Sequence, residues 1–300
     1  MARIEQKIQE LKGKRDAVIL AHNYQLPEIQ DIADFVGDSL ELAKISRTVK
    51  AGVIVFCGVH FMAETAKLFN PEKTVLMPDL HAGCPMANMI TPERLTREKD
   101  KHPGVPVITY INSTAEIKAM SAICCTSANG VRVVRSLKEK EIIFIPDKYL
   151  GSFIARQVLE KTFYLYEGYC PTHMLFSKEG IARIKKEHPE TQVVVHPECR
   201  LDVQEIADVI CSTSQMIVFA KQSAATEFII CTEIGMLYRL QKEVPGKNFI
   251  SGNPHALCPN MKLMTLEKVL WSLEDLKYEI TVDQAIRDKA LRTIERMVAL

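Results

Sequence analysis

The sequence predicts an α/β fold of three similar α/β/α sandwich units, each built on a parallel sheet. Three cysteines that precede a proline, Cys84, Cys170 and Cys258, lie 86 and 88 residues apart, which indicates an internal repeat. Each cysteine follows, at a similar distance, a run rich in β-branched residues: AVILAHNYQ, PVITYINST or QVVVHPECR. Within each copy, short apolar strands alternate with helical patterns, which is typical of parallel sheets covered by helices on both faces.

The three copies keep one alignment frame along their length. The frame aligns His22 with Tyr110 and His196, Tyr24 with Asn112 and Glu198, Ser39 with Ser127 and Thr213, and Met62 with Leu150 and Met236. A frame that holds at so many positions indicates that each copy folds as one structural module.

The order of elements expected in each copy is strand, helix, short strand, helix, strand, helix, strand. In the first copy, a helix over 27–35 follows the opening strand, with Pro27 in its first turn, where proline is tolerated. Asp38 to Glu41 resembles a capping box for the next helix. Strands over 52–58 and 74–79 then flank a helix over 61–69. The corresponding later strands are EIIFIPD and TFYLYEG in the second copy, and EFIICTE and NFISGNP in the third.

Helical patterns are also expected at both ends of the chain. The N-terminal segment MARIEQKIQELKGKRD is charged and helical in pattern, and residues 265–280 and 283–300 carry apolar side chains at intervals of three and four. We expect these helices to close the first unit. The expected domains are residues 1–104, 105–190 and 191–264, followed by closing helices in 265–300.

Composition favours a globular protein that acts on small molecules. The 300 residues are 47% apolar and 25% charged, which is near the globular average. The 38 basic and 37 acidic side chains give a net charge of +1, so the sequence lacks the basic character of a protein that binds nucleic acid or anionic membranes. No apolar run approaches the roughly 18 to 20 residues of a membrane span, and we expect a cytoplasmic location.

The nine cysteines do not suggest a disulfide framework, because their number is odd and the expected compartment is reducing. Cys199 is ambiguous, and five others lie in apolar strings typical of buried packing: Cys57, Cys124, Cys125, Cys211 and Cys231. The three Cys-Pro positions differ. Loops beyond the carboxyl ends of parallel strands form ligand sites, so three units that face one another would bring these thiolates together.

Three converging thiolates are a plausible ligand set for an iron–sulfur cluster. Two other interpretations remain open from the residues alone. The Cys-Pro loops could be inherited with the repeat and have no shared role, or they could form a zinc site with His81, His173 or His255 as the fourth ligand.

Polar residues at the same strand ends could serve acid–base chemistry and substrate binding. His22, Tyr24, Tyr110, Asn112, His196 and Glu198 supply donors, acceptors and proton carriers. Ser39, Ser127 and Thr213 stand where a strand gives way to a helix, so they could hold a carboxylate or phosphate, or could act as ordinary N-caps.

The motifs AHNYQ, GDSLELA, CPMA, TYINS, CTSAN, GYCPTH, HPEC, STSQM and EFIICTE resemble those of the quinolinate synthase family over essentially the whole chain. The resemblance implies a triangle of three homologous α/β domains around a central site. It also implies a 4Fe-4S cluster on the pseudo-threefold axis, held by Cys84, Cys170 and Cys258, with one iron open.

The resemblance further implies a reaction in which iminoaspartate and dihydroxyacetone phosphate condense to quinolinate, with loss of phosphate and two waters. The open iron would act as a Lewis acid, and another enzyme would supply iminoaspartate. The implied acid–base residue is Glu198, helped by Tyr24 and Tyr110. The implied substrate-binding residues are His22, Ser39, Asn112, Ser127, His173, His196 and Thr213. We expect no nucleic-acid or membrane partner.

The chain departs from some family members at two places. Cys258 is followed by Pro259, Asn260 and Met261, so the CxxCxxC pattern of a disulfide switch is missing. A basic residue is missing near Ala225 and Thr226, and Lys221 is a candidate to compensate. Alternative functions are an iron–sulfur hydro-lyase acting on a hydroxydicarboxylate, a cluster-bearing sensor, or a zinc-stabilised binding protein.

Overall fold

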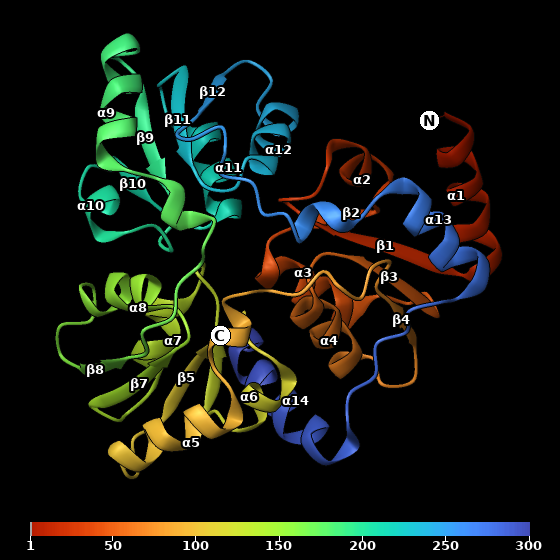
Figure 1. Ribbon diagram of the computed structural model, residues 1–300, viewed down its shortest axis with the longest axis horizontal. Helices are drawn as coiled ribbons and strands as arrows, with labels where there is room; N and C mark the ends of the chain where they lie inside the picture. Colours follow the sequence, from red (N-terminus) through yellow and green to blue (C-terminus); the bar gives the residue numbers. More distant parts are fainter. Residues whose placement is uncertain (1) are drawn as a thin grey trace.

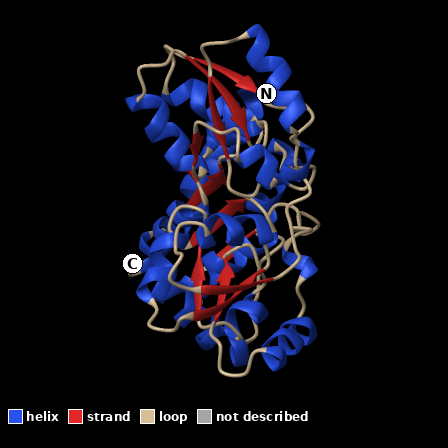
Figure 2. Cartoon of the chain, turned by 90° about the vertical axis from the view of Figure 1, so that its left-hand side faces the viewer, coloured by secondary structure: helices blue, strands red, loops and turns tan. Residues whose placement is uncertain are grey.

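The computed structural model describes residues 2–300, which form three lobes arranged in a triangle (Figure 1). Each lobe contains one four-stranded sheet, in the orders β2-β1-β3-β4, β6-β5-β7-β8 and β10-β9-β11-β12. Every pairing within these sheets is parallel. Figure 2 shows strands enclosed between helices. The predicted α/β class and the threefold repeat are confirmed.

The first lobe follows the predicted element order. Its elements are β1 (Ala17–His22), α2 (Pro27–Ile32), β2 (Phe35–Gly37), α3 (Ser39–Thr48), β3 (Val53–Cys57), α4 (His60–Phe69) and β4 (Thr74–Leu76). The expected capping box is present, since the Asp38 side chain accepts from the Leu40 and Glu41 N–H groups while Glu41 accepts from the Asp38 N–H. The helix expected over 27–35 ends at Ile32, because Phe35 pairs with Leu20 in β2.

The second and third lobes repeat this order. The second contains β5 (Val107–Tyr110), α6 (Ala115–Ala119), β6 (Ile123–Cys125), α7 (Gly130–Ser136), β7 (Glu141–Ile145), α8 (Lys148–Ala155) and β8 (Thr162–Leu165). The third contains β9 (Gln192–Val195), α10 (Leu201–Gln204), β10 (Val209–Ile210), α11 (Thr213–Gln222), β11 (Glu227–Cys231), α12 (Gly235–Glu243) and β12 (Asn248–Ser251). The central strands are almost wholly buried because helices cover both faces of each sheet.

Each Cys-Pro loop leads into a short 3-10 turn and then a helix. The turns are η1 (Ala87–Met89), η2 (His173–Leu175) and η3 (Met261–Leu263), and the helices are α5 (Pro92–Lys101), α9 (Lys178–Glu187) and α13 (Leu266–Asp275). Thr91, Ser177 and Thr265 cap these helices by the same side-chain hydrogen bond. Each of these helices packs on the next lobe around the ring, since α5 contacts α6, α9 contacts β11 and α13 contacts β3.

The two ends of the chain pack differently from each other. Helix α1 (Ala2–Arg15) contacts α13, so these helices cover the first lobe as expected. Helix α14 (Gln284–Val298) instead lies mainly against α6 and β6 of the second lobe, and it also contacts α4 of the first lobe. The expectation that both C-terminal helices close the first unit is therefore wrong for α14.

The chain before α14 explains this difference. Ile280 N–H donates to the Val75 carbonyl and Met77 N–H donates to the Tyr278 carbonyl, so the segment runs along the outer strand β4 and away from α1. The buried face of α14, with Ala290, Ile294 and Met297, then joins the core, and Cys124 Sγ donates to Thr293 Oγ1 at 3.5 Å. Within residues 2–300, no helix has the length and apolar character needed to cross a membrane.

This packing predicts that Ile294→Ala destabilises the protein. Ile294 is fully buried, so its truncation leaves a cavity and should lower the free energy of unfolding by about 3 kcal/mol. The measurement is the urea midpoint followed by circular dichroism. Arg292→Ala, an exposed change on the same helix, is the control, and equal midpoints for the two variants would show that α14 is not docked as described.

Candidate active site

In each lobe, one backbone hydrogen bond ties the beginning of the Cys-Pro loop to the start of a helix. In each lobe a helix follows the third strand. A backbone N–H at the start of that helix donates to the carbonyl of the residue two positions before the cysteine. The three bonds are His60 N to Ala82 O, Lys148 N to Gly168 O and Ile234 N to Ala256 O, each 2.9 Å long. The three loops therefore leave their sheets at equivalent points, which gives Cys84, Cys170 and Cys258 equivalent positions in the three lobes.

The three cysteines are free thiols that are partly buried. Burial raises the pKa of Cys84 to about 12 and also raises the pKa values of Cys170 and Cys258. Backbone N–H groups of the following turns oppose this effect: those of Ala87 and Met86 at Cys84, His173 at Cys170, and Met261 and Asn260 at Cys258. Each turn thus offers its thiolate the backbone donors that a buried ligand sulfur needs.

The cysteine loops line one central cavity of about 170 Å³. Among residues 2–300, the three thiols do not form a group whose ligand atoms all lie within 4.8 Å of one another, whereas Cys170, His173 and Glu198 do. Ligands of a single zinc ion lie closer together, since each Zn–S bond is only about 2.3 Å. Three thiols spaced more widely around one cavity fit a group with several metal atoms, in which each thiolate binds a different atom.

Of the three histidines considered as a fourth zinc ligand, only His173 lines the cavity. His81 and His255 are exposed and do not line the cavity. His173 does line it, but Nε2 lies 2.9 Å from Thr232 Oγ1 and Nδ1 lies 2.9 Å from Glu198 Oε2. Among the described residues, Nδ1 has no hydrogen bond, and the close group of possible ligand atoms to which His173 belongs contains only one of the three cysteines.

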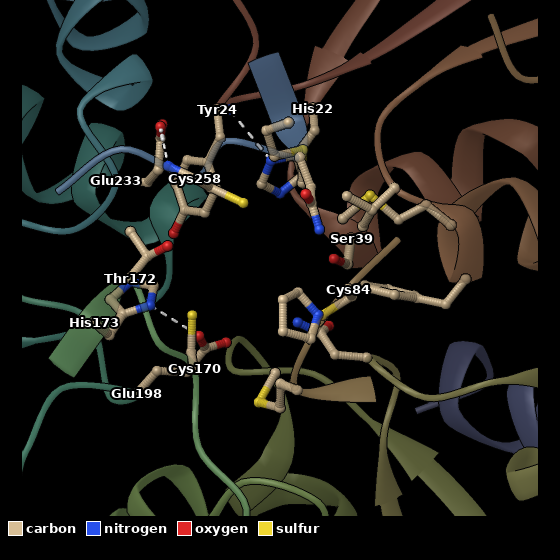
Figure 3. A pocket seen from close by; sticks show the side chains of 18 of the residues that line it. His22, Tyr24, Ser39, Cys84, Cys170, Thr172, His173, Glu198, Glu233 and Cys258 are labelled. Carbon is tan, nitrogen blue, oxygen red and sulfur yellow. Dashed lines mark hydrogen bonds and ion pairs between the residues drawn. The ribbon is translucent and has the colours of Figure 1, made fainter. Parts of the chain in front are cut away.

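All the site residues expected from the sequence line this cavity, and they come from all three lobes. Most of the side chains labelled in Figure 3 point from several directions into the same space, whereas the Glu233 carboxylate turns away from it toward the Cys258 N–H. The lining residues at the strand ends are His22, Tyr24, Tyr110, Asn112, His196 and Glu198, and those at the starts of the next helices or turns are Ser39, Ser127 and Thr213.

A chain of contacts connects the two tyrosines through Glu198. Tyr110 Oη donates to Glu198 Oε1 at 2.5 Å, and Glu198 Oε2 lies at ion-pair distance from His173, although the ring N–H is not aligned on that oxygen. Thr232 Oγ1 lies 2.9 Å from His173 Nε2 and 2.5 Å from the Tyr24 hydroxyl. The chain crosses all three lobes and offers a path for protons.

Glu198 and Asp147 are buried carboxyls whose pKa values move in opposite directions. Burial opposes ionisation of Glu198, but His173, His196 and the Tyr110 hydroxyl hold its pKa below the usual range. Burial and the charge of Glu198 raise the pKa of Asp147, whose Oδ2 has no hydrogen-bond partner. Glu198 is thus the ionised member of the pair at neutral pH. Burial and the same charge raise the pKa values of Tyr24 and Tyr110, which stay protonated.

His22 and His196 are held as neutral donors. Burial lowers the pKa of each to about 3. The Tyr24 N–H donates to His22 Nδ1 at 3.1 Å, and the Glu198 N–H donates to His196 Nδ1 at 3.4 Å. Because Nδ1 accepts in both rings, the proton of each neutral ring is on Nε2.

The hydroxyl residues are not the helix caps. The N-caps of α3 and α11 are Asp38 and Ser212, which leaves Ser39 and Thr213 as the first helical residues. Ser127 lies in the turn before α7, whose N-cap is Asn129. The N-cap interpretation is therefore wrong for these hydroxyls, and all three line the cavity.

Sequence reasoning missed a buried ion pair behind Cys258. Glu233 Oε1 accepts from the Cys258 N–H at 3.0 Å and lies 2.9 Å from Lys262 Nζ. Lys262 also donates to the Tyr24 carbonyl, so it joins the first lobe to the third. The repeat frame could have signalled this residue, since it aligns Glu233 with Asp147, but it also aligns both with Val59.

No lysine or arginine in the described part of the chain lines the cavity. Lys221 does not fill that role, because its ammonium pairs with Glu243 at 2.7 Å on the surface. The donors that face the cavity are therefore neutral hydroxyl, imidazole, phenol and amide groups.

Comparisons with known proteins agree with the sequence motifs. The family model described as quinolinate synthetase A protein matches residues 6–299. A quinolinate synthase of Thermodesulfovibrio yellowstonii is 51% identical over 298 residues, covering 99% of this chain and 98% of the relative. One of Dehalococcoides mccartyi is 54% identical over 295 residues, covering 98% and 97%, and one of Geotalea uraniireducens is 50% identical over 297 residues, covering 99% and 97%.

A match of this length and identity extends over all three lobes and all three cysteine loops. The chain belongs to the quinolinate synthase family, the enzymes that make quinolinate for NAD biosynthesis.

Proposed function

We propose that this enzyme condenses iminoaspartate with dihydroxyacetone phosphate to form quinolinate, with loss of phosphate and two waters. Quinolinate synthases are iron–sulfur enzymes, and here we assign Cys84, Cys170 and Cys258 as ligands of a 4Fe-4S cluster. The observation that carries the proposal is the single cavity lined by three equivalent thiols and by the contact chain through Glu198.

The bound cluster would supply a Lewis acid at its iron without a protein thiolate, which suits the loss of hydroxyl groups during dehydration. The chain's contribution is to hold the three thiolates. The turns after the cysteines direct backbone N–H groups at the sulfurs, and Glu233 fixes the N–H of Cys258.

The substrates are anions, and neutral donors would bind them. We assign the hydroxyls of Ser39, Ser127 and Thr213 to carboxylate or phosphate oxygens, because the N-termini of α3 and α11 favour negative charge at this place. The Nε2–H donors of His22 and His196 and the amide of Asn112 complete this set. His173 would act by orienting Glu198 while facing the substrate.

Glu198 is the proposed base. Its carboxylate is ionised and contacts both Tyr110 and His173, so a proton taken from an intermediate can be shared along the chain. Tyr110 and Tyr24 remain protonated and can donate to a leaving hydroxide. Condensation and dehydration both need a base and an acid in the same cavity, and this arrangement supplies both.

The hydro-lyase and sensor alternatives share the cysteines but not the family membership, which favours quinolinate formation. Because an imine of this kind is unstable in water, we also propose functional coupling to an enzyme that produces iminoaspartate.

The cysteine assignment predicts separate effects for cysteines inside and outside the cavity. Cys84→Ala, Cys170→Ala and Cys258→Ala should each lose the cluster, because each removes a ligand. Cys57→Ala should keep it, since Cys57 is packed in the core. Iron content and the visible spectrum after anaerobic reconstitution measure the effect. A brown, iron-replete Cys170→Ala protein would contradict the assignment.

Glu198→Gln should keep the cluster but lose turnover. The amide fills the same space but cannot accept the proton, so the rate of quinolinate formation should fall by about 10² to 10⁴. Iron content and quinolinate are measured on the same sample, with Glu205→Gln, an exposed change nearby, as the control. Unchanged quinolinate formation would remove Glu198 from the role of base.

The Thr232 hydroxyl, rather than the shape of the side chain, should determine the effect of this residue on turnover. Thr232→Val removes the bridge between His173 and Tyr24 while it keeps the side-chain shape, and the loss of these hydrogen bonds should slow turnover about tenfold. Thr232→Ser restores the hydroxyl and should recover most of the rate. Equal rates for the valine and serine variants would show that the contact chain carries no protons.

A further inference from the structure

A second recess lies between the second and third lobes, next to the central cavity. Its volume is about 460 Å³, and its walls come from the turn before α7, from α7 and α8, and from the start of α11. Ser127 lines both this recess and the central cavity. The two spaces are thus separated by little more than one turn of the chain.

The wall between the two spaces includes one hydrogen bond that joins the second lobe to the third. Gln215 Nε2 donates to the Ala128 carbonyl at 3.4 Å, and Gln215 Oε1 accepts from the Ser212 N–H at 2.9 Å. At 3.4 Å this bond is long, so it contributes little to the stability of the wall between the two spaces.

The recess has the positive charge that the central cavity lacks. Arg132 and Arg135 line it, and no aspartate or glutamate does. Within residues 2–300, neither arginine forms an ion pair. Arg135 Nη2 donates to the Gln157 carbonyl at 2.8 Å, which holds this side chain at the wall. The remaining guanidinium donors are available to an anion.

A buried amide in the same wall lacks an acceptor. Asn129 is only 4% exposed, and its Oδ1 accepts from the N–H of Thr126 at 2.8 Å, but its Nδ2 has no hydrogen-bond partner. The repeat frame aligns Asn129 with Glu41 and Gln215, and both of those side chains bond to a neighbouring lobe. An unpaired buried donor is costly, and an anion oxygen in the recess would satisfy it.

From these features we propose that the recess binds a small dianion, bearing a phosphate group or two carboxylates, next to the central cavity. Two guanidinium groups and the Asn129 amide hold it there. The arginines raise the local concentration of anionic substrate, and the neutral cavity beyond then binds it by shape and hydrogen bonds. The identity of the dianion as a substrate rests on the proposed function, whereas anion binding in the recess does not.

The test compares Arg132→Gln/Arg135→Gln with the control Arg97→Gln/Arg183→Gln, which removes the same charge from exposed sites elsewhere. Inorganic phosphate is titrated at low ionic strength and followed by calorimetry. The first variant should bind one phosphate ion fewer per chain than the wild type, and the control should match the wild type. Equal phosphate binding by all three proteins would overturn the proposal.

Kinetics on the cluster-loaded enzyme give the second readout. For dihydroxyacetone phosphate, kcat/KM should fall about tenfold in the recess variant at low salt, and this difference should vanish near 1 M salt, where charges are screened within about 3 Å. Loss of phosphate binding in a protein that makes no quinolinate would support the recess while refuting the proposed function. If the wild type makes quinolinate and the recess variant keeps both its phosphate binding and its kcat/KM, the proposed function would be supported and the recess proposal refuted.

Discussion

The carboxyl ends of three parallel sheets meet in this protein. One backbone hydrogen bond, repeated in each lobe, fixes the loop that carries a cysteine to this meeting point. The bonds to Ala82, Gly168 and Ala256 hold three loops at the same distance from their sheets, so the cysteines two residues later reach one cavity. A backbone bond of this kind does not depend on side-chain identity, which explains how His60, Lys148 and Ile234 occupy the same structural position. The equivalent placement of the three thiols follows from this common geometry.

Charge is distributed unevenly around the site. The cavity contains an ionised Glu198 among neutral donors, while the buried pair of Glu233 and Lys262 lies behind one cysteine loop. Positive charge that could meet anionic substrates lies outside, in the wall of the neighbouring recess. This separation spares Glu198 a further loss of basicity. His173, His196 and Tyr110 already lower its pKa, and a cation inside the cavity would stabilise the carboxylate still more.

The repeat made most of the fold and the lining of the site predictable from the sequence. The order of strands and helices along each copy and the convergence of the strand ends follow from patterns that recur three times, and the capping box at Asp38 follows from a local motif. The position of α14 could not be predicted, since its apolar face is compatible with either lobe and the path of the preceding segment decides between them. The pairing of Glu233 with Lys262 was also hidden, because Val59 interrupts the pattern in the first copy and the lysine has no place in the repeat.

Helix α14 touches α4 in the first lobe and α6 in the second, so it bridges two modules that precede it by more than a hundred residues. During synthesis, each lobe can form its sheet as it emerges, but the link that α14 makes between the first two lobes forms only after residues 284–298 have left the ribosome. A nascent chain therefore presents its cysteine loops before their final arrangement is fixed. The proposed cluster would therefore be loaded after the individual lobes have folded, which would separate cofactor delivery in time from the formation of the three sheets.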